Sequence, residues 1–181
     1  MKNLLLTTCF AISGYCIYGQ IYTAKSGEVT FFSEAPIENI EAVNKVATSL
    51  LNTASNDIVF SVTMIAFEFE KALMREHFNE NYMETEKYPK AAFKGKINET
   101  IDFTKDGTYQ VSATGKLTIH GVEQDRTIEG TLTVNEGQIL LKTEFKVLLK
   151  DHNIKIPKLV IKNLAEEVLV KASASYAPYK K

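Results

Sequence analysis

Alternation of hydrophobic and polar residues dominates the second half of the chain. Tyr109, Val111 and Leu117 alternate with polar residues in the clearest of these stretches. Successive side chains of a β-strand point to opposite faces, so this period of two predicts strands with one buried face. The strands predicted in this way, together with shorter candidates nearer the N-terminus, cover residues 29–33, 46–52, 58–64, 91–97, 108–119, 127–134, 139–149 and 168–176.

Short polar connections separate neighbouring strands. Residues 55–57, 105–107 and 135–137 are rich in Ser, Asn, Asp and Gly, and His120-Gly121 separates two other alternating stretches. Such residues tolerate the backbone angles that tight turns require. The connections therefore predict hairpins, and hairpins predict an antiparallel sheet.

One segment breaks the alternation. Between residues 70 and 83, Met74, Phe78 and Tyr82 recur at a spacing of four. This spacing places them on one side of a helix, so the segment predicts a short amphipathic helical insertion. It is expected to end before Pro89, because the residue that precedes a proline avoids the helical region.

About eight strands in one domain can form a sandwich or a closed barrel. Small residues are frequent on the predicted inner face, and a solid core would place larger side chains there. We therefore predict an all-β fold, an eight-stranded antiparallel barrel with an apolar hollow. The alternative reading is that the small residues allow the strands to bend and pack closely. The residues concerned are Gly95, Ala113, Gly115, Gly130, Ala172 and Ala174.

The N-terminal segment predicts export. Lys2 is followed by an apolar run from Leu4 to about Tyr18, and small Gly19 follows that run. This is the pattern of a secretory signal peptide, and the run is shorter than the ~20 residues of a membrane-spanning helix. We expect a signal peptide at residues 1–19, a single domain at 20–181, and a periplasmic or secreted location without stable membrane insertion.

Composition narrows the possible partners and chemistry. Both cysteines, Cys9 and Cys16, fall in the predicted signal, so the exported domain is expected to lack disulfides. The net charge is −1 and there is no basic stripe, which argues against a nucleic-acid partner. The sequence shows no nucleophile motif and no metal-ligand spacing among its histidines, so we predict no catalytic site, metal site or cofactor.

Polar residues gather in the predicted helical insertion and at one turn. Arg75 and His77 lie among Phe78, Tyr82 and other apolar residues. One reading is a lid at the barrel mouth, with the apolar residues on a ligand's tail and the polar ones on its head. The other is a solvated helix face. His120 similarly faces either the pocket or the backbone of its own turn.

These segments resemble the YceI-like, polyisoprenoid-binding family. Arg75-Glu76-His77-Phe78, followed by Tyr88-Pro89-Lys90-Ala91-Ala92-Phe93, is similar to its Arg/His and Tyr-Pro-x-x-x-Phe signature. Residues 115–122 match its Gly-x-Leu-Thr-x-His-Gly segment, and 151–154 occupy the place of an Asp-aromatic-Gly turn. The usual N-terminal His is missing from residues 26–38, so the contact that it makes does not carry over.

The resemblance implies a lipocalin-like, exported barrel whose tunnel holds an isoprenoid chain, such as a polyprenyl phosphate or a quinone. We therefore expect a non-enzymatic binding protein for an amphiphilic lipid, with a homodimer as one option for its oligomeric state. Two alternatives stay open: an interaction or stress module with a filled barrel, and an enzyme that uses His77 or His120 as a base. The expected ligand contacts are Phe60, Val62, Arg75, His77, Phe78, Tyr82, Phe93, Tyr109, Val111, His120, Phe145 and Tyr176.

Overall fold

The sheet has nine strands in the computed structural model, which describes residues 21–34, 39–156 and 165–179. All of its pairings are antiparallel, and β4 has only two residues. The strands are β1 (Ile21–Ser33), β2 (Ile40–Asn52), β3 (Asp57–Thr63), β4 (Glu68–Phe69), β5 (Lys90–Ile97), β6 (Gly107–Ile119), β7 (Val122–Asn135), β8 (Gln138–Leu148) and β9 (Glu167–Pro178).

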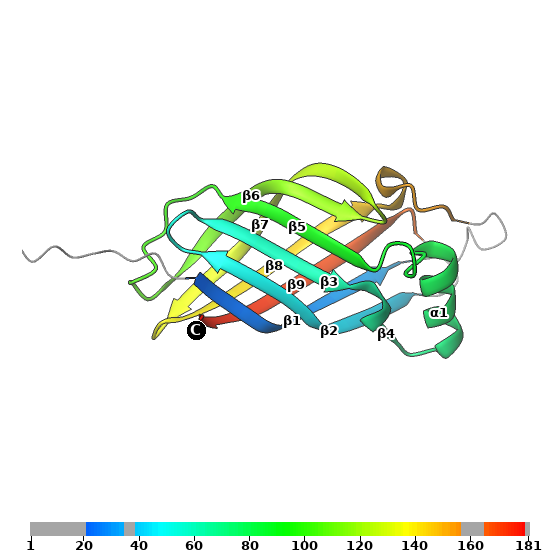
Figure 1. The fold of residues 1–181 in the computed structure, drawn as a ribbon, viewed down its shortest axis with the longest axis horizontal. Helices are drawn as coiled ribbons and strands as arrows, with labels where there is room; N and C mark the ends of the chain where they lie inside the picture. The colour runs from blue at the N-terminus through cyan, green and yellow to red at the C-terminus, as the bar shows by residue number, and fades with distance from the viewer. Residues whose placement is uncertain (1–20, 35–38, 157–164, 180–181) are drawn as a thin grey trace, which may run out of the picture.

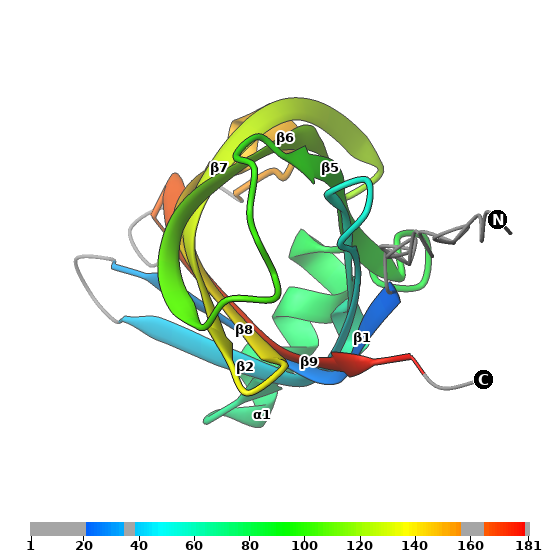
Figure 2. The ribbon, with the colours of Figure 1, turned by 90° about the vertical axis from the view of Figure 1, so that its left-hand side faces the viewer.

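The eight longer strands close into a ring. Their order is β1-β9-β8-β7-β6-β5-β3-β2, and pairing of β1 with β2 completes the circle, while β4 pairs with residues 42 and 43 of β2, beyond the end of the β2–β3 ladder. Figure 2 looks along the barrel and shows the strands around a central space. The predicted all-β, eight-stranded antiparallel barrel is therefore confirmed.

Two hairpin turns have the backbone that the sequence predicted. His120 and Gly121 have φ values of 52° and 72°, and Glu136 and Gly137 have 48° and 76°. Each pair lies between directly paired residues, Ile119 with Val122 and Asn135 with Gln138. Positive φ at both central residues defines the two-residue turn that matches strand twist.

The strands begin earlier than the alternation indicated in several places. β7 begins at Val122, five residues before its predicted start at 127. Gln124 and Arg126 share the strand phase of buried Ile128 and Leu132, so polar residues interrupt the hydrophobic period there. β1 and β2 are likewise longer than predicted, because their ladder to each other continues past the hydrophobic stretches.

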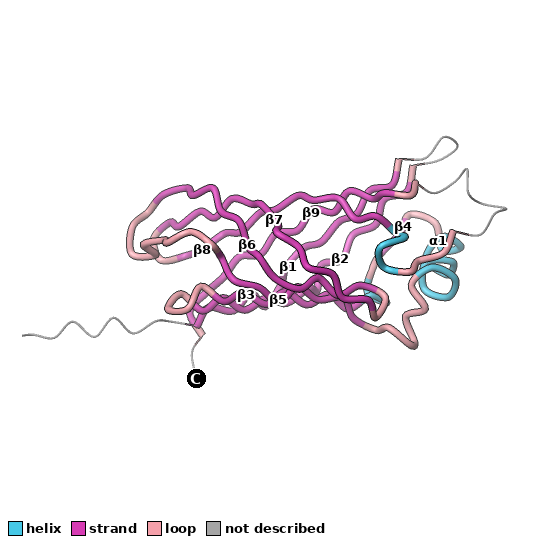
Figure 3. The backbone as a smooth tube through the Cα atoms, turned by 90° about the horizontal axis from the view of Figure 1, so that it is seen from above, coloured by secondary structure: helices cyan, strands magenta, loops and turns pink. Residues whose placement is uncertain are grey.

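The helical segments gather at one end of the barrel (Figures 1 and 3). η1 (Met64–Ala66), α1 (Ala72–His77) and η2 (Phe78–Tyr82) lie between β3 and β5, and η3 (Leu149–His152) follows β8. The predicted helical insertion at 70–83 is confirmed, with a wider π-type turn at 78–82. Among the described residues, no helix has the length and apolar character needed to cross a membrane.

The opposite end of the barrel is solid. Tyr176, Leu51 and Leu132 are almost completely buried there, and the Tyr176 hydroxyl lies 2.6 Å from Ser49 Oγ. The connection between β5 and β6, residues 98–106, crosses this opening in Figure 2, and its Ile101 and Phe103 pack on the core. The predicted signal peptide at 1–19 lies outside the described residues and stays a prediction.

Candidate ligand-binding cavity

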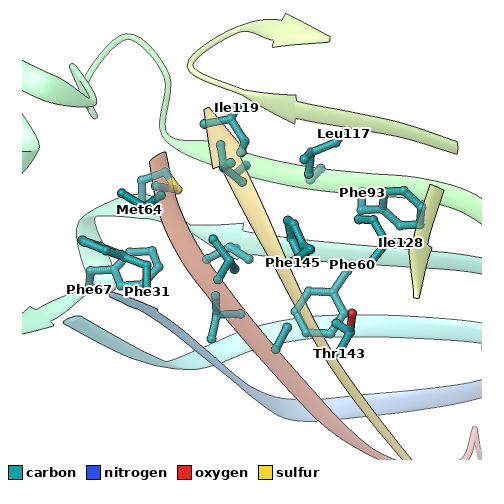
Figure 4. Close-up of a pocket in the computed structure, with 18 of the residues that line it drawn as sticks. Phe31, Phe60, Met64, Phe67, Phe93, Leu117, Ile119, Ile128, Thr143 and Phe145 are labelled. Atoms are coloured by element: carbon teal, nitrogen blue, oxygen red, sulfur yellow. The ribbon is translucent and has the colours of Figure 1, made fainter. Parts of the chain in front are cut away.

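The barrel encloses a cavity of about 200 Å³, counted as space for the centre of a water-sized sphere. Its lining residues extend from Phe78 and Tyr82 of the helical insertion as far as Ile58 and Ile97, which lie beside the β2–β3 turn. In Figure 4, Phe31, Met64 and Phe67 lie at one end of the row of lining residues, and Phe60, Phe93 and Thr143 lie at the other. The predicted hollow is therefore present, but it does not extend through the solid end.

The cavity wall is almost entirely hydrophobic. Apart from Glu129, Gly130 and Thr143, every lining residue has a hydrophobic side chain, and the Glu129 side chain is exposed. Within residues 21–34, 39–156 and 165–179, no Lys, Arg or His lines the wall. Such a surface binds ligands by removing their apolar area from water.

Four phenylalanines pack together at the helical end. Phe31 and Phe78 stack with ring centroids 5.5 Å apart, and Phe67 and Phe69 contact both of them at 5.0–5.8 Å. All four rings also line the cavity. The insertion thus supplies one wall of the site. In the sequence, the closely spaced aromatic residues of Phe31-Phe32 and Phe67-Glu68-Phe69 could have indicated this cluster.

Seven of the expected ligand contacts line the cavity. They come from four strands and the helical insertion, which bring together residues far apart in the sequence. Met74, on the same helical side, joins them. The seven are Phe60, Val62, Phe78, Tyr82, Phe93, Val111 and Phe145.

Tyr109 and Tyr176 lie outside the cavity wall, in the solid end of the barrel. The Tyr109 hydroxyl donates to the Lys105 carbonyl at 3.0 Å, and Tyr176 is only 1% exposed. Ser49 Oγ donates to the Val59 carbonyl at 2.8 Å, so the Tyr176 hydroxyl is the donor to Ser49. Burial raises the pKa of Tyr176 to about 12.

The three expected head-group contacts do not line the cavity either. Arg75 is exposed on α1, and His77 Nδ1 lies 3.1 Å from Asn81 Nδ2 at the surface. His120 is buried in its turn, where its ring contacts Tyr88 at a centroid distance of 4.4 Å. These positions correspond to the structural readings of the polar cluster and of His120.

His120 connects three segments at the helical end. Nε2 lies 2.9 Å from Glu84 Oε2, and Nδ1 lies 3.1 Å from the His152 carbonyl oxygen. Both partners are acceptors, so each contact is a hydrogen bond only when that nitrogen carries a proton. His152 in turn donates from Nδ1 to the Val122 carbonyl at 3.1 Å, and burial lowers its pKa, which favours the neutral imidazole.

The small residues of the inner face have two roles. Ala113 and Ala172 line the cavity, where a larger side chain would occupy its space, and Gly130 lines it as well, although a Cβ there would lie 2.7 Å from the Lys142 carbonyl oxygen of β8. Gly115 and Gly95 instead allow β5 and β6 to approach, since a Cβ on Gly115 would lie 2.2 Å from the Lys94 carbonyl oxygen. Both alternatives drawn from the sequence therefore hold, each at different positions. Among the described residues, no group of three or more His, Cys, Asp or Glu could hold a metal ion.

A closed antiparallel barrel with an apolar interior is an architecture that can hold one small hydrophobic ligand. This chain belongs to the YceI-like domain family, whose model matches residues 17–176. The family that the motifs resembled is therefore confirmed. No curated protein matches the chain.

Solved structures share this fold at low sequence identity. Burkholderia cenocepacia BcnA is 17% identical, with a TM-score of 0.70, over 83% of this chain and 96% of that one. A polyisoprenoid binding domain from Saccharophagus degradans, implicated in plant cell wall breakdown, is 15% identical, with a TM-score of 0.71, over 87% and 98%. A Campylobacter jejuni YCEI protein is 17% identical, with a TM-score of 0.62, over 82% and 90%.

Proposed function

We propose that this protein is an exported, non-enzymatic carrier of an amphiphilic lipid with a prenyl chain. The observation that carries the proposal is the hydrophobic cavity, whose wall contains no Lys, Arg or His among the described residues. The name of the Saccharophagus degradans domain, which shares the fold, supports an isoprenoid as the ligand. Each CH₂ moved from water into the cavity contributes about 0.8 kcal/mol before ordering costs.

The wall favours a chain with an uncharged head, such as a prenol or a quinone, over a polyprenyl phosphate. A phosphate inside the barrel would lose its hydration, and the lining residues that the structure describes include no cation to compensate. The expected contacts on the chain are Phe60, Phe93 and Phe145, which line the cavity away from the four phenylalanines of the helical end. Arg75, His77 and His120 are not needed for this role.

The alternatives are less well supported. The interaction or stress module would have a barrel filled throughout. The described interior instead contains a cavity, and side chains fill the barrel at one end. An enzyme that used His77 or His120 as its base would need that ring at the cavity, and both lie outside its wall. The export that the N-terminal pattern predicts suits a carrier, since a lipid chain needs a protein shell to cross an aqueous compartment.

Extraction and mass spectrometry of the purified protein test the proposal. We expect a prenyl lipid in the organic extract, and a higher midpoint of thermal unfolding when farnesol or geranylgeraniol is added. Ala172→Leu places a larger side chain in the cavity wall and should abolish both effects. Ala177→Leu, on an exposed position of the same strand, is the matched control. No extracted lipid and no stabilisation by any prenol would contradict the proposal.

A further inference from the structure

β7 and β8 are paired along only part of their length, and we call the unpaired stretch of the barrel wall between them the seam. Their ladder extends only from the pair Gly130–Thr143 to the pair Asn135–Gln138. β7 continues to Val122 along β6, and β8 continues to Leu148 along β9. Residues 122–129 therefore face residues 144–148 without strand pairing between them.

Side chains, rather than a ladder, span this seam. Arg126 Nη2 donates to the Lys146 carbonyl at 2.7 Å, and Gln124 Nε2 donates to the Asp151 carbonyl at 2.8 Å. At the last rung, Thr143 Oγ1 donates to the Glu129 carbonyl. A side chain can release such a bond by changing its rotamer, whereas opening a ladder requires both strands to move.

The sequence explains why pairing stops here. Gln124 and Arg126 occupy the strand phase that points inward at Ile128 and Leu132. A polar side chain at such a position cannot join an apolar core without a partner. Reaching across to main-chain carbonyls of the β8 side satisfies the side-chain donors and separates the strands.

The cavity shares lining residues with a groove on the outside of the barrel where the seam begins. The three lining residues that are not hydrophobic, Glu129, Gly130 and Thr143, all lie at the rung where the seam begins. The same three residues, together with Ala172 of β9, line both the cavity and a polar groove on the outside of the barrel. Gly130 contributes no side chain, so the wall between groove and cavity is thin at this point.

The two ends of the barrel are more firmly closed across the described residues. One end is filled by a solid core around Tyr176 and Leu132. At the other, the rings of Phe31, Phe67, Phe69 and Phe78 contact one another. Opening either end would separate packed apolar groups, whereas the hydrogen bonds described across the seam come from three side chains, those of Gln124, Arg126 and Thr143.

We propose that the seam between β7 and β8 is the port through which the cavity exchanges its ligand, with the polar end of the ligand left at Glu129, Gly130 and Thr143. The inference rests on the proposed function and adds its access route. The ligand class that it fits is a single-chain amphiphile. Such a chain can slide between two separated strands, and its head then finds the polar part of the wall.

A change in the port should alter the rate constants of ligand uptake and release by the same factor. Their ratio, which is the dissociation constant, should stay unchanged. We expect Arg126→Met to accelerate uptake and release of parinaryl alcohol, an uncharged fluorescent single-chain amphiphile, by about tenfold each, since it removes one charge-assisted hydrogen bond. The affinity should stay within about twofold of the wild type. Lys116→Met is the matched control, because it removes a cation and its ion pairs with Glu123 and Asp125 on the paired side of β7. Stopped-flow fluorescence measures uptake, and mixing with excess phosphatidylcholine vesicles measures release.

A disulfide across the seam gives the opposite change. Glu129 and Glu144 are exposed and follow the last paired rung on the outer face. The variant Glu129→Cys/Glu144→Cys, with Cys9 and Cys16 replaced by serine, should slow both rates at least about tenfold when oxidised, and a reductant should restore them. The reduced protein is its own control.

Two outcomes would overturn the inference, and they are distinguishable. Normal binding with unchanged rates, both in Arg126→Met and in the oxidised double variant, would show that the ligand passes elsewhere. A wild-type protein that takes up neither parinaryl alcohol nor a prenol would overturn the proposed function, and the port with it.

Discussion

His120 Nε2 lies 2.9 Å from Glu84 Oε2, and this contact joins the β6–β7 turn to the segment that follows the helical insertion. The same ring reaches the His152 carbonyl through Nδ1, so a single side chain links three connections at one end of the barrel. A residue that the sequence offered as a ligand contact thus has the contacts of a structural one.

Replacing His120 should therefore reduce stability and leave binding unchanged. His120→Asn keeps a residue type that tolerates the positive φ of this turn but is too short for both contacts. We expect the free energy of unfolding to fall by about 1–3 kcal/mol in urea denaturation. Prenol affinity should stay within about twofold. His77→Asn is the control, and a loss of affinity without a loss of stability in His120→Asn would contradict this assignment.

Tyr176 should make the barrel sensitive to alkali. Burial raises its folded-state pKa to about 12, whereas an unfolded tyrosine titrates near 10. Between these values the unfolded chain has lost the proton and the folded chain keeps it, so stability falls by about 1.4 kcal/mol per pH unit as pH rises above about 10. Tyr176→Phe should remove this dependence.

The measurement is urea unfolding between about pH 9 and 12. Tyr179→Phe, at an exposed tyrosine, is the control and should keep the alkaline loss of the wild type. Equal pH slopes in Tyr176→Phe and the wild type would mean that another group dominates. At neutral pH, Tyr176→Phe should cost only about 1 kcal/mol, because Ser49 keeps its bond to the Val59 carbonyl.

His152 should make the protein sensitive to acid. Burial lowers its folded-state pKa, so below about pH 6.5 the unfolded chain binds a proton that the folded chain excludes. Stability is therefore fully present above the unfolded pKa and is lost as pH falls. His152→Gln should show a smaller decrease in the free energy of unfolding between about pH 6.5 and 5. An unchanged acid slope would contradict this role.

The stacked pair of Phe31 and Phe78 should be a major source of stability at the helical end. Phe78 is 8% exposed and contacts three other phenylalanine rings. Phe78→Ala should lower the free energy of unfolding by about 3 kcal/mol or more, because it removes apolar contacts and enlarges the cavity. Leu73→Ala on the same insertion is the control, since Leu73 is 61% exposed. Equal losses in the two variants would contradict packing of the insertion on the barrel.

Much of the architecture was predictable from local pattern. The alternation over 108–119 and the Gly at 121 and 137 fixed strands and hairpins, because a side-chain period of two and a positive φ are properties of a few consecutive residues. The four-residue spacing of Met74, Phe78 and Tyr82 placed all three on the cavity. The start of β7 was not predictable, because polar Gln124 and Arg126 occupy inward positions. These positions belong to the strand, but β8 does not pair with β7 there.

The sequence by itself determined an antiparallel barrel, its helical insertion and the side of each strand that faces inward. Only the tertiary structure decided how far along the barrel each inward residue lies. Tyr176 and Phe145 both point inward, yet one fills the solid end and the other lines the cavity. The reason is that alternation reports the face of a strand, whereas depth along the axis depends on the register of every neighbouring strand around the closed ring.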